Sequence, residues 1–158
     1  MFIVERLQPQ DLPAIVNLAC EFKLESQTVS PLFDELNTDY KDILRNQLKQ
    51  YLQEEKCAIL IAKLAADNTI IGFIIGYIWE YLPIYEIRHM GYIPELFVKS
   101  NYRSQGVGCA LLSHVEDWFR QQNIKYSRIE TIHLYARNKS FYEKRGYNVF
   151  LLEMRKIL

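Results

Sequence analysis

A short glycine-containing segment is the part of the chain whose residue types and spacing point most directly to chemistry. It reads Arg103-Ser104-Gln105-Gly106-Val107-Gly108, between an apolar run and a stretch whose apolar residues recur at helical spacing. The glycines are therefore expected at a helix N-terminus, where the first N–H groups have no acceptor inside the helix. Glycine also lets backbone come close to a ligand. This combination predicts a site for an anionic phosphate.

A glutamate lies inside the apolar run that precedes this segment. Glu95 belongs to the stretch 92–98, whose apolar and aromatic composition predicts a strand. A carboxylate surrounded by apolar side chains can reach the basicity that a general base needs, so Glu95 is the best candidate for that role. Two other interpretations stay open: an exposed carboxylate at a strand edge, and a carboxylate that binds a substrate cation.

Two segments together resemble a known family. The glycine-containing segment fits the acetyl-coenzyme A (acetyl-CoA) signature of the GNAT (general N-acetyltransferase) superfamily: Arg or Gln, two residues, Gly, one residue, then Gly or Ala. A later segment, Phe141-Tyr142-Glu143-Lys144-Arg145-Gly146-Tyr147, resembles the family's Phe-Tyr-Glu-Lys-x-Gly-Phe/Tyr segment. The order and separation of the two suit the family. The resemblance covers about residues 92 to 148.

The resemblance implies acetyl-CoA as cosubstrate and a set of cofactor contacts. Backbone N–H groups near Val98 would hold the acetyl carbonyl or the pantetheine arm, and those from Gln105 to Ala110 would bind the pyrophosphate. Where the family often has an asparagine, this chain has Tyr135. Either a shortened connection lets Asn138 make that contact, or backbone alone makes it. The implied cofactor contacts are Leu96, Phe97, Val98, Arg103, Ser104, Gln105, Gly106, Val107, Gly108, Cys109, Ala110, Asn138 and Tyr142.

Three of these side chains have a specific expected role and a simpler alternative. Tyr142 matches the family's frequent general acid and would protonate the coenzyme A thiolate as it leaves; alternatively it packs on the core. Arg103 adds a positive charge beside the phosphate site, or is an ordinary solvated arginine. Cys109 falls in the first turn of the expected helix, where a thiol can be activated, but packing is favoured because no histidine in its segment can serve as a base.

The acceptor site is expected in the parts of the chain least like the family. These are the loop 25–36 and the aromatic segment 79–86. Aromatic walls with two carboxylates suit a cationic amine, so the expected acceptor-binding residues are Glu80, Tyr81, Tyr85 and Glu86. The same aromatic cluster can instead form the contact of a homodimer.

Length and composition indicate one domain. The chain has 158 residues, close to the commonest domain size, so residues 1–158 are expected to form a single domain. The formal net charge is zero, which argues against a nucleic-acid partner. The three cysteines have neither disulfide nor metal-ligand spacing, and no metal site is expected. The longest apolar stretch is too short for a bilayer and the N-terminus lacks a signal pattern, so no membrane partner and a cytoplasmic location are expected.

The pattern of elements predicts an α/β domain with a mixed sheet. An irregular aromatic segment is expected at 80–91, a hairpin turn at 65–68, and a helix capped by Asp39. The expected strands are 2–6, 57–64, 69–79, 92–98, 127–134 and 148–155, and the other expected helices are 9–25, 106–122 and 139–144. The resemblance implies the three-layer GNAT fold, with helices flanking a central sheet whose fourth and fifth strands splay apart.

The function that follows is an N-acetyltransferase. It would move acetyl from acetyl-CoA to a primary amine, most simply that of a small molecule, by direct attack in a ternary complex. Two alternatives remain: a protein lysine or N-terminal acetyltransferase, and a non-catalytic acyl-CoA sensor on the same fold. A dinucleotide or P-loop enzyme is disfavoured because the loop lacks the third glycine of the one and the lysine of the other.

Overall fold

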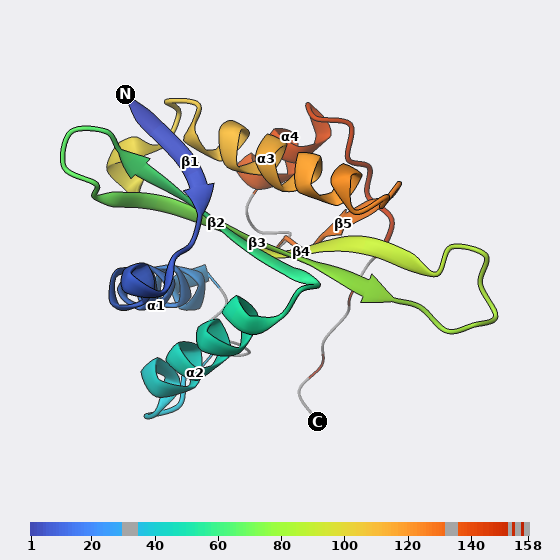
Figure 1. Cartoon of the computed structure of the whole chain (residues 1–158), viewed down its shortest axis with the longest axis horizontal. Coiled ribbons are helices and arrows are strands. Elements are labelled where there is room, and N and C mark those ends of the chain that lie inside the picture. The colour runs from blue at the N-terminus through green and yellow to red at the C-terminus, as the bar shows by residue number, and fades with distance from the viewer. Residues whose placement is uncertain (30–34, 132–135, 152, 154–155, 157–158) are drawn as a thin grey trace.

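The computed structural model of the chain describes residues 1–29, 35–131, 136–151, 153 and 156. Within them, helices and strands alternate in a mixed α/β order (Figure 1). The elements are β1 (Phe2–Arg6), the 3-10 turn η1 (Pro9–Asp11), α1 (Leu12–Val29), α2 (Tyr40–Gln53), β2 (Cys57–Leu64), β3 (Ile70–Glu80), β4 (His89–Val98), the 3-10 turn η2 (Ser100–Tyr102), α3 (Val107–Gln121), β5 (Ser127–Ile129) and α4 (Ala136–Glu143).

The sheet has the strand order β1-β2-β3-β4-β5 and is mixed. Neighbouring strands are antiparallel from β1 to β4, and β5 adds in parallel to β4. Helices α1 and α2 cover one face and α3 and α4 the other, so the molecule has three layers (Figure 1). One apolar core lies beneath α1 and α2 and a second beneath α3. This architecture confirms the expected α/β fold class.

The central strands are apolar along almost their whole length because helices cover both of their faces. In β2 all residues but the last are buried, and in β3 the first seven are buried. Glycines let α3 come close to the sheet. A Cβ built on Gly76 would lie 2.4 Å from Val115 Cγ2, and one on Gly91 would lie 2.7 Å from the Phe119 ring. The absence of a side chain at these two positions therefore determines how closely α3 packs on the sheet.

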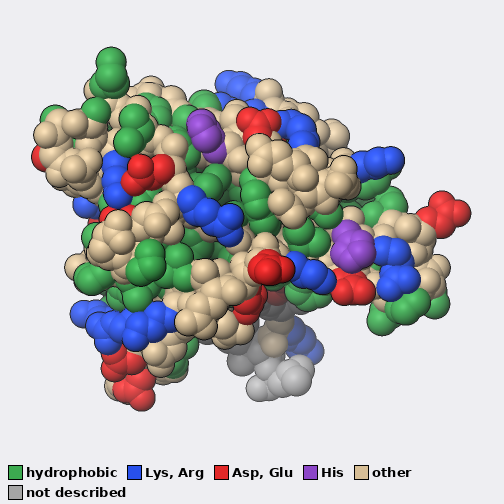
Figure 2. Space-filling model, viewed as in Figure 1, with side chains coloured by type: hydrophobic (Ala, Val, Ile, Leu, Met, Phe, Trp, Pro, Cys, Tyr) green, Lys and Arg blue, Asp and Glu red, His purple; other side chains and the backbone are tan. Residues whose placement is uncertain are grey.

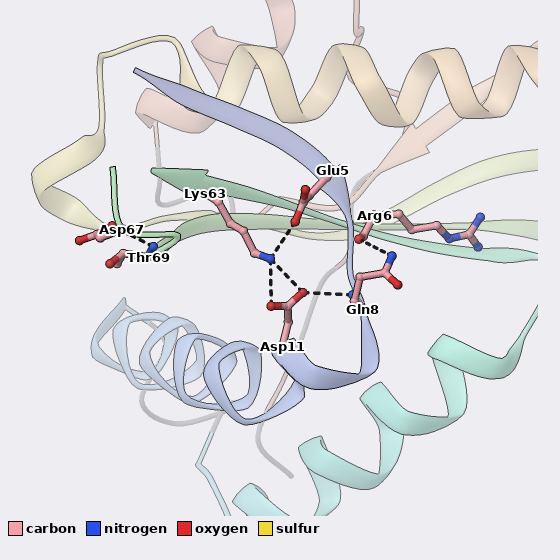
Figure 3. A network of polar contacts seen from close by, with 7 residues as sticks. All are labelled: Glu5, Arg6, Gln8, Asp11, Lys63, Asp67 and Thr69. Atoms are coloured by element: carbon pink, nitrogen blue, oxygen red, sulfur yellow. Dashed lines mark hydrogen bonds and ion pairs between the residues drawn. The ribbon is translucent and has the colours of Figure 1, made fainter. Parts of the chain in front are cut away.

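A buried lysine ties the edge of the sheet to the start of α1. Lys63 of β2 is only 8% exposed, and its ammonium contacts Glu5 Oε1 at 2.7 Å and Asp11 Oδ1 at 2.9 Å. The Gln8 backbone N–H donates to Asp11 Oδ2 at 3.2 Å. Figure 3 shows the Lys63 ammonium between the two carboxylates, which come from β1 and η1. The network satisfies a buried charge with two partners.

Most expected elements are confirmed, and the hairpin turn at 65–68 joins β2 to β3 with Asn68 at φ +59°. The helix expected at 9–25 begins as a 3-10 turn and then continues as α1 to Val29. Asp39 does precede α2, but its expected side-chain cap is wrong. Its backbone is not extended, and one of its carboxylate oxygens accepts instead from the Thr38 hydroxyl at 3.1 Å.

The segment expected to be irregular at 80–91 is a continuation of two paired strands. Glu80 ends β3 and pairs with His89 of β4, so only residues 81–88 form the connecting loop. The sequence did not predict this pairing, because apolar and polar residues do not alternate regularly in this aromatic segment. It is the part in which the hairpin extends beyond the helix layers (Figure 1). The hairpin extends beyond the rest of the molecule (Figure 1).

Two expected strands near the C-terminus are shorter or absent. β5 contains only Ser127–Ile129; Glu130 and Thr131 are not in a strand, and residues 132–134 lie outside the described part. Asn148–Leu151 and Glu153 are also not in a strand, which corrects the strand expected at 148–155; residues 152, 154 and 155 lie outside the described part. An apolar run forms a strand only where a neighbouring edge accepts its backbone, and 149–151 are exposed instead.

Candidate active site

The strands of the described part of the chain leave the second half of β4 without a neighbour on its β5 side, and we call this side of β4 the gap. β5 pairs with β4 only through Gly91↔Ser127, Tyr92↔Arg128 and Ile93↔Ile129. β4 continues to Val98, but among the described residues no strand pairs with this part on the β5 side. Pairing between the fourth and fifth strands therefore ends at Ile93 and Ile129.

A β-bulge lies where the two strands part. Ile75 pairs with Glu95 and Tyr77 with Tyr92, so two residues of β4 stand opposite Gly76 alone. One of the two is Pro94, which has no N–H and is tolerated at a bulge. A bulge bends the strand and turns its side chains, which explains why β4 leaves β5 at this point.

The backbone of β4 beyond the bulge presents donors to the gap. The Lys99 N–H donates to the Ile71 carbonyl at 2.9 Å, on the β3 side. Backbone groups alternate between the two sides of a strand, so the N–H groups of Leu96 and Val98 point away from β3 and into the gap. Oriented N–H groups of this kind can stabilise negative charge on a carbonyl oxygen.

The glycine-containing segment forms the loop that leads into α3. Ser104 has φ +63°, and Gly106, at the N-cap of α3, has φ +84°. A Cβ built on Gly106 would meet nothing within 4 Å, so its side is open. The first helical bond from this turn is Ala110 N–H to the Gly106 carbonyl at 3.0 Å. The first N–H groups of α3 have no acceptor inside the helix, so they can donate to an anion.

Arg103 links the loop to β4 and α1. Its Nε donates to the Val98 carbonyl at 2.7 Å, its Nη2 donates to Glu25 Oε2 at 2.6 Å, and its guanidinium lies 5.4 Å from the Phe97 ring centroid. Arg103 is thus a structural tie as well as a positive charge, and its charge is paired with a carboxylate of α1. Within the loop, the Gln105 side chain donates to the Asn101 carbonyl at 2.9 Å.

The late segment packs α4 against the first turn of α3. Tyr142 is 8% exposed, and burial raises its pKa to about 12, with a smaller opposing effect of Arg145. The Arg145 guanidinium lies 3.8 Å from the Phe141 ring centroid and contacts the Cys109 sulfur. Tyr142 therefore keeps its proton at physiological pH. Asn138, one turn earlier on α4, is exposed.

Glu95 is held by a lysine of α1. The Lys23 ammonium contacts Glu95 Oε1, and the side chains of the two residues are 31% and 14% exposed. Glu95 and Phe97 share a face of β4, and Phe97 belongs to the core beneath α1 and α2. Lys23 also lines a hollow of ≈ 240 Å³ between α1 and α2, whose other described lining residues are Glu35, Leu36, Asn37, Tyr40, Ile43 and Leu44.

The end of β4 lies beside the N-terminus of α3, since a Cβ built on Gly108 would lie 3.8 Å from Val98 Cγ2, and this placement suits the cofactor position that the resemblance implies. The family model described as "Acetyltransferase (GNAT) family" matches residues 15–147, which is most of the chain. The chain belongs to this family. It is therefore an acetyl-CoA-dependent acyltransferase.

Similar proteins agree with this assignment. The chain is 27% identical to the uncharacterised N-acetyltransferase YhfO of Bacillus subtilis, over 78% of this chain and 83% of YhfO. A predicted acetyltransferase of Clostridium acetobutylicum, solved with acetyl-CoA, shares the fold at a TM-score of 0.80 with 19% identity, covering 98% and 96% of the two chains. An aminoglycoside acetyltransferase from an uncultured soil sample, in complex with sisomicin, has a TM-score of 0.72 with 19% identity, covering 99% and 96%.

The residues expected to bind the acceptor lie on the β3–β4 hairpin of this acetyltransferase. The Glu80 carboxylate lies 3.7 Å from the Lys56 ammonium and 3.6 Å from the Arg88 guanidinium. The Tyr81 hydroxyl contacts Met90 Sδ at 3.8 Å, and the ring centroids of Tyr81 and Tyr85 lie 6.1 Å apart. Glu86 is exposed. Glu80 is five residues along β3 from the partner of Glu95, which at about 3.3 Å per residue is roughly 17 Å. The hairpin residues and Glu95 are thus not brought together.

The hairpin tip is apolar on its surface. Figure 2 shows hydrophobic side chains at the end of the protruding hairpin, next to charged ones. The exposed apolar residues of this part are Leu82, Ile84, Tyr85 and Ile87. The expectation of a dimer contact at this segment stays a prediction.

None of the helices in the described part of the chain has the length and apolar character that crossing a membrane requires.

Sequence reasoning missed Lys23, and it placed Glu25 in the expected acceptor loop 25–36 without its contact with Arg103; the side chains of these two α1 residues reach β4 and the glycine loop. They lie 72 and 78 positions from their partners Glu95 and Arg103. Nothing in the local pattern of α1 marks them, because charged residues on a helix are most often solvated. Only the packing of α1 across the sheet brings them to the site.

Proposed function

We propose that this acetyltransferase transfers acetyl from acetyl-CoA to a primary amine of a small molecule, by direct attack of the amine in a ternary complex. We also propose that residues 1–158 form one domain. The observation that carries the proposal is the presence of two donor sets: the Leu96 and Val98 N–H groups of β4, which no strand in the described part of the chain pairs, and the N-terminus of α3. One set suits an acyl carbonyl and the other a diphosphate.

The residues present fit acetyl-CoA at this position. The first N–H groups of α3, which have no acceptor inside the helix, would bind the pyrophosphate, and the open side of Gly106 leaves room for it. The N–H groups of Leu96 and Val98 would bind the pantetheine arm and the acetyl carbonyl. The bound cosubstrate supplies an activated thioester.

Two side chains provide for the protons of the reaction. Glu95, directly or through one water, would accept the proton that the amine loses as its nitrogen forms a bond to the acetyl carbon. The N–H groups of β4 would stabilise the negative charge that develops on the acetyl oxygen. The Tyr142 hydroxyl would donate a hydrogen bond to the sulfur as the C–S bond breaks and coenzyme A leaves as its thiolate.

The size of the hollow at Lys23 supports a small acceptor. Its volume of ≈ 240 Å³ lies below the roughly 300–1,000 Å³ typical of sites for drug-sized ligands. One of the structurally similar proteins is an aminoglycoside acetyltransferase, which also supports a small-molecule acceptor. Acetylation of a protein lysine or N-terminus, and acyl-CoA sensing without turnover, are the alternatives that the experiments below separate.

The first test is thermal stabilisation by acetyl-CoA, with ATP and NAD as comparisons. A ligand at about 100 times its Kd adds about 2.7 kcal/mol to the free energy of unfolding, so a clear rise in Tm is expected with acetyl-CoA alone. Gly106→Glu places a carboxylate at the phosphate site and should abolish the rise. Gly146→Glu is the matched control, because Gly146 has the same left-handed backbone, φ +85° against +84°, and equally open surroundings.

The second test is release of the coenzyme A thiol with a panel of small primary amines and of lysine-containing peptides. Turnover with a small amine supports the proposal. Turnover with peptides alone would make the protein a protein acetyltransferase. A saturable Tm shift without thiol release from any acceptor would leave a sensor and end the enzymatic proposal.

A further inference from the structure

The carboxylate proposed as the base is not open to an incoming amine, because a lysine of the protein already occupies it. The Lys23 ammonium contacts Glu95 Oε1 and also lies 5.1 Å from the Phe22 ring centroid. Glu95 is mostly buried, and Lys23 is about one third exposed. The pair therefore stands at the boundary between solvent and β4.

Lys23 connects this pair to the hollow where a small acceptor would fit. It lines the hollow between α1 and α2, while its ammonium reaches Glu95 on β4. The hollow is otherwise lined mainly by apolar and uncharged side chains. Its other charged lining residue among those described is Glu35, which is exposed. An acceptor in the hollow thus meets the Lys23 ammonium with the Glu95 carboxylate behind it, and the exposed Glu35 is the other charge among the described lining residues.

The charges of the pair discriminate between kinds of amine. A simple cationic amine must separate Lys23 from Glu95, and it then leaves the Lys23 ammonium without a partner beside a second positive charge. Leaving one member of a partly buried ion pair unpaired is costly, and like charges side by side add to the cost. An amine that carries its own carboxylate gives each member a new partner, with its ammonium at Glu95 and its carboxylate at Lys23.

We propose that the acceptor is an amine with a neighbouring anionic group, of the α-amino acid type, and that Lys23 is the residue that binds that group. This inference rests on the proposed function and names its substrate class. The ammonium of Lys23 and the carboxylate of Glu95 form a complementary pair for a zwitterion. The small hollow limits the side chain that such an acceptor can carry.

The test compares each amino acid with its own amide and its own decarboxylated amine. The panel includes tyrosine, tyrosinamide and tyramine, and lysine, lysinamide and cadaverine, with thiol release giving kcat/KM for each. For the best acceptor, the acid is expected to exceed its amide and amine by about 10²-fold or more, because the analogues leave Lys23 unpaired. Lys23→Gln should collapse this ratio mainly through the KM of the acid, and Lys23→Glu should invert it. Lys23→Arg should retain a preference for the acid.

Controls separate failure of this inference from failure of the proposed function. Lys49→Gln removes an exposed lysine of α2 and should leave the acid-to-amine ratio unchanged. The Tm shift with acetyl-CoA should be the same in wild type, Lys23→Gln and Lys49→Gln. The inference is overturned if amines without an anionic group are acetylated as efficiently as the acids and Lys23→Gln leaves the acid-to-amine ratio of kcat/KM unchanged. The proposed enzymatic function is then retained. If no amine is acetylated, both fall.

Discussion

The behaviour of Tyr142 shows how burial controls a single residue. The side chain lies among Phe141 and Tyr147 and apolar residues of α3, and burial raises its pKa from an ordinary value near 10 to about 12. A thiol has a pKa of about 8.5, so complete proton transfer from Tyr142 to a thiolate is uphill. The hydroxyl is better suited to donating a hydrogen bond that strengthens as charge develops on the sulfur.

Replacing this hydroxyl should affect turnover more than binding. In Tyr142→Phe we expect kcat to fall by about 10²-fold, because the transition state loses a hydrogen bond to the charge that develops on the sulfur. The Tm shift with acetyl-CoA should persist. Steady-state thiol release at pH 7.5 measures the change. Tyr147→Phe is the control, since it removes another partly buried tyrosine hydroxyl that bonds to Glu116 at 2.9 Å. If Tyr142→Phe keeps kcat within about threefold, the residue only packs the core.

Close contact between α3 and the sheet depends on glycines in the strands. Gly76 and Gly91 lie beneath Val115 and Phe119, and a Cβ at either position would come closer than 3 Å to those side chains. The glycine loop and the N-terminus of α3 are positioned by the same helix. Packing at the middle of α3 therefore supports the position of the proposed phosphate site at its start.

Adding a methyl group at Gly91 should strain this interface. Its Cβ would lie 2.7 Å from Cδ2 and Cε2 of Phe119, and overpacking of a core costs about 1–3 kcal/mol. We expect Gly91→Ala to lower the free energy of unfolding by that amount in urea denaturation. In the Phe119→Leu background the same change should cost less, because the smaller side chain leaves room. The effects of substitutions at two contacting residues on the free energy of unfolding should not be additive, so equal costs in both backgrounds would contradict the packing explanation.

The network at Lys63 joins β2 to β1 and to the turn that starts α1 (Figure 3). We expect Lys63→Met to lower the free energy of unfolding by about 3–5 kcal/mol, because two carboxylates lose their buried counter-ion. Chemical denaturation measures the loss. Lys49→Met, at an exposed position of α2, should change stability by less than about 0.5 kcal/mol. A loss at Lys63 no larger than this control would mean that the carboxylates find other partners.

Several buried acids of the whole molecule hold their protons more tightly than they would in the unfolded chain. Burial raises the pKa of the Cys57 thiol from 9 to about 12, and that of Tyr142 to about 12. Burial likewise raises the pKa of Tyr92 and Tyr147 well above 10. Cys57 belongs to the core beneath α1 and α2, and Tyr142, with Tyr147 packed against it, to the core beneath α3, so titration of these groups is coupled to unfolding of both cores.

The molecule should therefore lose stability in alkali. Above pH 9 to 10 the unfolded chain releases protons that the folded chain retains, so the free energy of unfolding falls as pH rises. Each such group contributes about 1.4 kcal/mol per pH unit between its unfolded and folded pKa. Urea denaturation at several pH values from 8 to 11.5 measures the slope. Tyr142→Phe should reduce the slope by nearly one proton between pH 10 and 12, and an unchanged slope would contradict the buried, protonated state.

Local patterns determined much of the fold and the position of one ligand site. Helical periodicity correctly predicted α1 and α3 to within a few residues and the presence of α2, because the pattern marks the covered side of each helix, and apolar composition predicted β2. The glycine loop was predicted at a helix N-terminus because the backbone conformation that it requires, such as the left-handed φ of Gly106, is a local property of the segment. Motif order also indicated the GNAT family, to which residues 15–147 match.

Tertiary structure alone decided how the site is completed. The bulge at Ile93 and Pro94, the early end of β5 and the projecting hairpin depend on which strand edges meet, which no single segment encodes. The contacts of Lys23 with Glu95 and of Glu25 with Arg103 join positions 72 and 78 residues apart. A sequence places charges along a chain, but only the packing of α1 across the sheet determines which carboxylate each ammonium and guanidinium will meet.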